Sequence, residues 1–397
     1  MEDLIVSDTY TRDHLKQLED RLSDYIEKNI HSIDMAIPAF LAHVRSTVNQ
    51  SAPRLSEPEY NLFMDGIACH IFRRSPHAND AAYNEELGRA LGEVKRGGGR
   101  GALDLVSGLH RIMQGNYERA LSLLKKYQVH DPLIGSARTY CSIRIDQKNP
   151  KVQSPGEPDP RPSEMILNAR EQLMEMAHNR PRLLIHPVLT MEERSLLLGI
   201  FWEVYEQARI WFPHESWFIS IALSIAEMEG DRRRHDEIVR DAIRDFPEDI
   251  RFLRVAFQDA LANGSIETAA LILKTMIRVM PDEGEPMYYG LRIALVTKKA
   301  HMYFRFRKLA IIRGLPAHLL HLLDYAFEAI SGNEKEAIAK RKLFLEYYPK
   351  LDYLMESLAY LEADTFSNDP VRQSRGSRAL TSVVDRFAMT VLQIGET

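Results

Sequence analysis

Apolar residues recur every three or four positions along nearly the whole chain, and the strict alternation typical of strands is almost absent. Near the start, one such stripe runs through a charged segment and consists of Leu15, Leu18, Leu22, Ile26 and Ile30. Further helical patterns cover roughly 33–48, 56–74 and 79–96, the second of them opening on Ser56 and Glu59 as a capping box. Residues 1–96 are therefore predicted to form an N-terminal unit of four helices.

A glycine-rich stretch, EVKRGGGRGALDL at residues 93–105, ends this unit. A phosphate-binding loop needs a strand before its glycines and a Lys followed by Ser or Thr after them. A dinucleotide fingerprint also needs a strand. Here a helical pattern precedes the glycines, and Lys95 and Arg96 suit the C-terminal end of a helix. We interpret residues 97–101 as a hinge or linker.

The segment after the glycines, residues 102–132, has the pattern of a helix hairpin. Gly108 falls where two helices would touch, Gly115 ends the first helix, Ala120 lies early in the second, and Pro132 stops it. Small residues at 108 and 120 allow paired helices to approach closely. The hairpin resembles a tetratricopeptide repeat.

The spacing of prolines and glycines extends this resemblance. Pro213, Pro247 and Pro281 are evenly spaced, and their interval is the tetratricopeptide period of about 34 residues. Gly230 and Gly264 precede the last two of these prolines by half a period, as Gly115 precedes Pro132. A later unit ends at Pro349, and the turn TKKAH of the unit before it lacks glycine.

We therefore predict an all-α fold: a tetratricopeptide-like helix-hairpin superhelix, or α-solenoid, over residues 102–349. An irregular loop with five prolines interrupts it at 147–163. Thr190 and Glu193 form a second capping box after this loop. Residues 350–397 are predicted to form a C-terminal pair of capping helices that closes the exposed end of the array.

The resemblance implies that the first helix of each pair lines a concave groove, which in this family holds a peptide or partner helix. Three rows of residues, spaced by one repeat period, fall on those helices: Trp217, Arg251, Glu285 and Leu319; Ser220, Arg254, Tyr288 and Leu322; Ser224, Gln258, Arg292 and Ala326. The candidate partner-binding residues are Trp217, Arg251, Arg254, Gln258, Tyr288 and Arg292. The Lys, Asn and Arg set of the carboxylate clamp is not reproduced. The alternative, that these are solvated side chains on an open face, stays open, and on such a face arginines contribute little to folding.

Composition changes this picture little. A formal net charge of -5 over 397 residues produces no global attraction to nucleic acid or anionic membrane. The two cysteines, Cys69 and Cys141, lie in helical stretches and are expected to be packed thiols, with a disulfide as the alternative. The start of the chain has no signal-peptide pattern, and no apolar run is long enough for a membrane span. We expect a cytoplasmic protein.

Motifs for catalysis, metals or cofactors are not apparent, so we predict neither an enzyme nor a cofactor or metal site. Residues 298–308, KKAHMYFRFRK, interleave cations and aromatics as nucleic-acid platforms do. Their place in a repeat favours packing roles for Tyr303, Phe304 and Phe306, so a nucleic-acid partner is disfavoured.

The prediction is thus a non-catalytic scaffold or adaptor that holds a protein or peptide partner in the groove. There are two alternatives. One is a nucleic-acid-binding repeat protein, and the other is an enzyme or regulator with a site between the N-terminal unit and the array. The sequence leaves homo-oligomerisation and the role of the 147–163 loop open.

Overall fold

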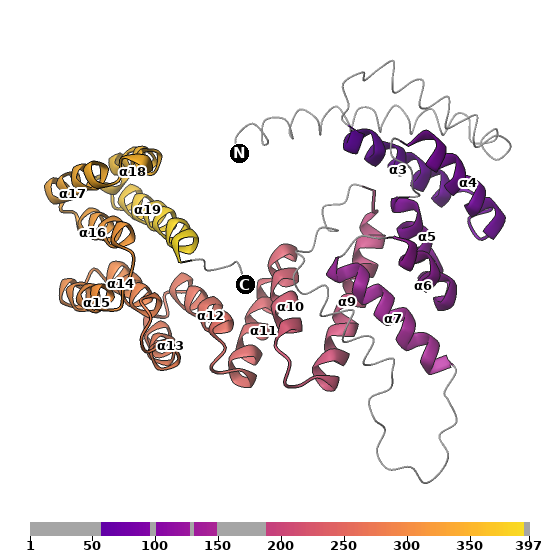
Figure 1. Ribbon diagram of the computed structural model, residues 1–397, viewed down its shortest axis with the longest axis horizontal. Coiled ribbons are helices and arrows are strands. Elements are labelled where there is room, and N and C mark those ends of the chain that lie inside the picture. Colours follow the sequence, from indigo (N-terminus) through magenta and orange to yellow (C-terminus); the bar gives the residue numbers. More distant parts are fainter. Residues whose placement is uncertain (1–56, 96–100, 128–130, 149–187, 393–397) are drawn as a thin grey trace, which may run out of the picture. The chain divides into compact units, whose positions relative to one another are not determined.

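The computed structural model describes residues 57–95, 101–127, 131–148 and 188–392. Over these residues the chain forms sixteen α-helices and one short 3-10 helix, with no strand (Figure 1). The predicted all-α class is therefore confirmed. Helices pack largely against their neighbours in sequence, an arrangement compatible with a helical repeat.

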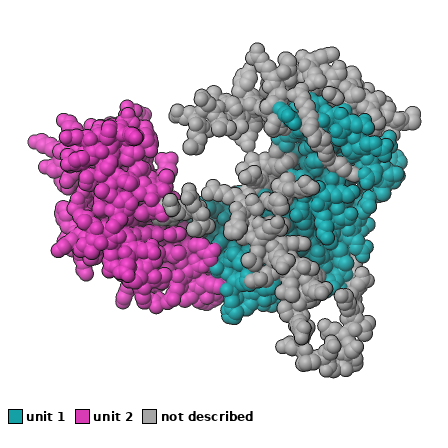
Figure 2. Space-filling model, in the orientation of Figure 1, with its two compact units in different colours: residues 1–235 teal, residues 236–397 magenta. Residues whose placement is uncertain are grey.

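The chain divides into two compact units, residues 1–235 and 236–397 (Figure 2). The boundary falls within helix α11, Arg232–Asp245. The other described helices of unit 1 are α3 (Glu57–Arg74), α4 (Ala81–Val94), α5 (Ala102–Met113), α6 (Tyr117–Lys126), α7 (Pro132–Lys148), α9 (Met191–Trp211) and α10 (Trp217–Glu229).

Unit 2 continues the succession of helix pairs and ends in a long helix. Its helices are α12 (Ile250–Ala262), α13 (Ile266–Val279), α14 (Glu285–Thr297), α15 (Ala300–Ile312), α16 (Ala317–Ser331), α17 (Glu334–Tyr347), η2 (Pro349–Leu351), α18 (Asp352–Thr365) and α19 (Pro370–Val391).

Residues with positive φ recur at a constant interval in the turns between paired helices. Gly230, Gly264, Lys298 and Gly332 have φ angles of 70°, 71°, 53° and 83°, and each is one repeat period from the next. Glycine suits this left-handed conformation because it has no Cβ. Lys298 occupies the glycine's place in TKKAH, so the turn that lacks glycine keeps the backbone of the others.

We expect Lys298→Gly to raise the free energy of unfolding by up to about 1 kcal/mol. The left-handed conformation costs a residue with a Cβ roughly 1 kcal/mol, and the greater freedom of glycine in the unfolded chain offsets part of that gain. Lys298 is exposed, so little packing is lost. Urea unfolding measures the change. Lys298→Ala, which shortens the same side chain but keeps the Cβ, is the control and should not stabilise; equal effects of both changes would contradict the argument.

Small residues allow close helix contacts where the sequence predicts them. A Cβ added to Gly108 on α5 would lie 2.9 Å from Leu124 Cδ2 on α6, and Ala120 is fully buried. Ala269 and Ala337 are also fully buried on α13 and α17. The packing role predicted for Gly108 and Ala120 is therefore confirmed.

The α14–α15 pair achieves close contact with a different residue. Tyr303 stands one repeat period after Ala269 and is buried, with its ring stacked on Phe327 at 4.1 Å between centroids. The close approach is at Gly290 instead, where a Cβ would overlap the ring of Phe306. The packing roles predicted for Tyr303 and Phe306 are confirmed.

The two ends of the glycine-rich stretch are held by one carboxylate. Lys95 Nζ donates to Asp65 Oδ1 at 2.8 Å and to Oδ2 at 3.0 Å. Asp65 also accepts a hydrogen bond from the backbone of Ala102, the first residue of α5. Gly101 has a φ of 49°, and a Cβ there would overlap Asp65 and Lys95. Residues 96–100 lie outside the described residues, but the last residue of the predicted hinge is a closely packed position within unit 1.

The second predicted capping box is confirmed. Thr190 Oγ1 accepts from Glu193 N at 3.2 Å, and Glu193 Oε2 accepts from Thr190 N at 2.9 Å. Glu193 also pairs with Arg73 of α3 at 2.6 Å, which joins the helices before the glycines to those after them. The stripe at 15–30, the Ser56 cap and nearly all of the 147–163 loop lie outside the described residues. Among the helices that are described, none is long and apolar enough to cross a membrane.

Candidate functional site

The candidate partner-binding residues are distributed over three helices and both units. Trp217 is on α10 in unit 1, where its indole Nε1 donates to Glu215. The other five belong to unit 2: Arg251, Arg254 and Gln258 on α12, and Tyr288 and Arg292 on α14. The structure therefore brings five of the six together on α12 and α14, and the candidate site is built from these two helices.

Arginines on α12 are engaged in ion pairs within the chain. Arg254 donates from Nε and Nη2 to the two carboxylate oxygens of Glu285, both at 2.7 Å. Glu285 is buried at the start of α14, so this bidentate pair joins α12 to α14. Arg251 pairs with Asp249, the residue that caps its own helix. Both arginines thus have partners within the chain, Arg251 in the turn before α12 and Arg254 at the start of α14.

Arg292 is buried, with only 5% of it exposed. Its Nη2 donates to Asp385 Oδ2 at 2.6 Å, and the Tyr288 hydroxyl donates to Asp385 Oδ1 at 2.6 Å. Burial, and then the negative charge of Asp385, raise the pKa of the Tyr288 phenol well above its ordinary value. The phenol therefore remains a hydrogen-bond donor, and Asp385 accepts from two buried partners.

Asp385 belongs to α19, which lies beside α16 and reaches α14 through these bonds (Figure 1). One stripe of α19 is buried, at spacings of four residues: Gly376, Leu380, Val384 and Ala388. His318 of α16 meets Phe387 edge-on, with 5.7 Å between ring centroids. The sequence predicts a helix pair that closes the end of the array; it does not predict that the second helix covers the first helices of the preceding pairs.

An open cleft of about 530 Å³ remains beside α19 within unit 2. We call α12, α14 and α16 the inner helices, because all three line this cleft. Their wall is largely apolar and includes Leu261, Leu295, Val296 and Ile330. The wall contributed by α19 is polar and comprises Gln373, Ser374, Ser377, Arg378 and Thr381. We refer to this site as the α19 cleft.

The α19 cleft carries an excess of positive charge. Arg292 and Asp385 line it but neutralise each other. Lys298 and Arg378 also line it, are exposed, and form no ion pair with any described residue. Gln258 adds an amide that makes no hydrogen bond within the described part of the chain. The cleft thus combines cations and an amide with apolar side chains, a combination suited to a peptide segment.

Both cysteines are free and buried, Cys69 on α3 and Cys141 on α7, so the packed-thiol prediction is confirmed. Burial raises the pKa of the Cys141 thiol to about 12 and that of Cys69 further. Thiolates are therefore rare at neutral pH, and neither residue is a candidate nucleophile.

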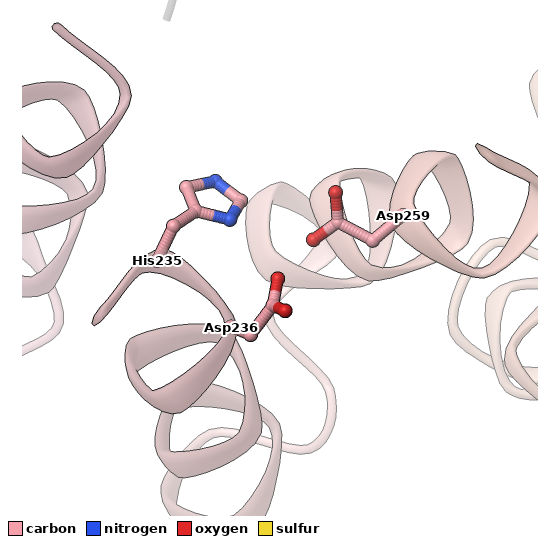
Figure 3. A group of neighbouring side chains, drawn as sticks. All are labelled: His235, Asp236 and Asp259. Carbon is pink, nitrogen blue, oxygen red and sulfur yellow. The ribbon is translucent and has the colours of Figure 1, made fainter. Parts of the chain in front are cut away.

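One group of side chains on α11 and α12 has the composition of a metal site. His235, Asp236 and Asp259 each offer a ligand atom, and these atoms lie within 4.8 Å of one another (Figure 3). Imidazole and carboxylate can bind divalent cations. All three side chains are only half-buried and take part in polar interactions of their own. Nothing else at this position points to a cation, so we assign no metal to it.

No family model matches the chain, and neither does any curated protein or solved structure.

Proposed function

We propose that the protein is a non-catalytic scaffold that holds a segment of a partner protein in the α19 cleft. The observation that carries this proposal is the cleft itself. It follows the inner helices, where the tetratricopeptide resemblance implies a binding groove, and two of its lining cations, Lys298 and Arg378, form no ion pair with any described residue. α19 lies beside the inner helices and supplies the second wall of the cleft.

The chemistry of the cleft favours a segment that combines an apolar side chain with an acidic one. Val296 is 46% exposed on the apolar wall and is available for contact. Arg378 on the opposite wall can pair with a carboxylate, and Gln258 can bond to a peptide backbone. Apolar burial would supply affinity, while the cations would select the acidic segment.

Photo-cross-linking tests the location of the partner. We expect p-benzoylphenylalanine at Val296 of the full chain to form protein adducts in an extract of the source cells. The same group at Leu271, which is 67% exposed on the outer helix α13, should not form them. Absence of adducts at Val296, or the same adducts at both positions, would count against a partner in the cleft.

Charge reversal tests the chemistry. Arg378→Glu should reduce the Val296 adducts by about tenfold or more, because it opposes an acidic partner at the cleft wall. Arg372→Glu is the matched control: it makes the same change of charge at an exposed position of α19 that does not line the cleft. Equal loss in the two variants would show that general charge, and not the cleft, governs capture.

A further inference from the structure

Residues 286–323 contain no Asp or Glu. Acidic residues number 56 of 397, so a span of this length would ordinarily contain several. The same span contains seven cations: Arg292, Lys298, Lys299, Arg305, Arg307, Lys308 and Arg313. A chain with a formal charge of -5 therefore carries a strongly basic region centred on α15.

Contacts elsewhere in unit 2 neutralise three of these seven cations. Arg292 pairs with Asp385, Arg307 with Asp324 and Arg313 with Asp282. The remaining four, Lys298, Lys299, Arg305 and Lys308, form no ion pair with any residue that the structure describes. All four are exposed. The positive charge around α15 is therefore uncompensated where it faces solvent.

The exposed side of α15 also carries large apolar side chains. Phe304, Ile311 and Ile312 are 57%, 54% and 66% exposed. At about 100° per residue they fall in one sector of the helix together with Arg305 and Lys308. We call these five residues the α15 face. The opposite side of the helix carries the buried Tyr303 and Ala310, which pack it onto the fold.

Phe304 fits the sequence interpretation of 298–308 only in part. All three aromatics of this stretch were expected to pack, and Tyr303 is buried while Phe306 fills the space at Gly290. The Phe304 ring meets Phe327 edge-on at 6.2 Å between centroids, but most of its surface stays exposed. A single exposed ring is a poor platform for successive stacked bases. The two isoleucines beside it need an apolar environment, which nucleic acid does not supply.

We propose that the α15 face docks on an anionic lipid surface. The exposed tips of Phe304, Ile311 and Ile312 would enter the interface between headgroups and acyl chains, while Arg305 and Lys308 contact acidic headgroups. Protruding apolar side chains and uncompensated cations on the same face together provide the two signals that stable membrane attachment needs. The α19 cleft uses other residues, so partner binding and lipid docking are separate properties.

Vesicle co-sedimentation of the full chain tests this inference. We expect binding to phosphatidylcholine vesicles that contain about one third phosphatidylserine, weakening as salt is added, and little binding to phosphatidylcholine alone. Arg305→Gln combined with Lys308→Gln should weaken the binding by about thirtyfold. Phe304→Ser combined with Ile312→Ser should weaken it at least as much, since the change removes apolar burial.

The matched control is Lys335→Gln combined with Lys342→Gln, which removes two exposed cations from α17. It should leave vesicle binding unchanged, and circular dichroism should show that all variants keep their helix content. Absence of binding to the acidic vesicles, equal binding to both vesicle types, or equal loss in the α15 and α17 variants would overturn the proposal. So would binding by the α15 face to an acidic peptide or to single-stranded RNA in preference to the acidic vesicles.

Discussion

Replacing Asp385 with alanine is expected to lower the free energy of unfolding by about 3–5 kcal/mol. The reason is the burial of Arg292, whose side chain is only 6% exposed and would lose its counter-ion. The Tyr288 hydroxyl would lose its acceptor at the same time. Removing one partner of a buried ion pair is costly because the remaining charge is left without solvation. Chemical denaturation of the full chain, followed by circular dichroism, measures the loss.

Two further variants separate this effect from a general weakening of α19. Combining Asp385→Ala with Arg292→Met should recover much of the lost stability, because a hydrophobic replacement of a buried pair is often neutral. Asp364→Ala removes a surface partner of Arg375, whose side chain is 75% exposed, and should cost no more than about 1 kcal/mol. If Asp385→Ala is as mild as Asp364→Ala, α19 is not held on the inner helices by this ion pair.

The Lys95→Met variant should be destabilised by about 3 kcal/mol or more at neutral pH, and by less as the pH falls. The side chains of Lys95 and Asp65 are only 7% and 11% exposed. Burial raises the pKa of the Asp65 carboxyl above its ordinary value, although Lys95 and the Ala102 amide act against this. Without Lys95 the pKa of Asp65 should rise further, because the hydrogen bond and the positive charge of Lys95 are both lost.

The sign of the pH dependence follows from proton binding. A carboxyl whose pKa is higher in the folded than in the unfolded protein binds more protons when folded, so acidification through that range stabilises the fold. The difference in the free energy of unfolding between the Lys95→Met variant and the unmodified chain should therefore shrink as the pH is lowered from 7 through the raised pKa of Asp65 toward 3.8. Urea unfolding at several pH values tests this. In the double variant Lys95→Met, Asp65→Asn, the loss of stability should no longer become smaller at low pH. A loss of stability in the Lys95→Met single variant that is independent of pH would contradict the mechanism.

The helix pairs were accessible to sequence analysis because their signals are local. The apolar period, the small residues at Gly108 and Ala120, and the Thr190–Glu193 box each act within one helix or between two consecutive ones. Lys298 shows the limit of such signals. It adopts the left-handed conformation although it is not glycine, so this turn lacks the residue by which a sequence pattern would reveal it.

The candidate site was only partly predictable. The repeat period places Arg254, Tyr288 and Arg292 on consecutive first helices, and the structure has them on α12 and α14. Their charge partners could not be predicted, since Glu285 and Asp385 have no special spacing from them. The burial of Arg292 could not be predicted for the same reason: nothing in the pattern of α19 indicates which helices its buried stripe covers.

The sequence by itself therefore determined the all-α class, the succession of helix pairs and the positions of the turns, because these depend on side-chain period and backbone conformation within a few residues. Only the tertiary structure decided which polar residues remain available. Asp385 and Arg292 lie far apart in the sequence, and their contact exists because α19 folds back beside the inner helices. The tertiary structure also decided the charge of the α15 face, because a cation stays uncompensated only if no carboxylate from another helix reaches it.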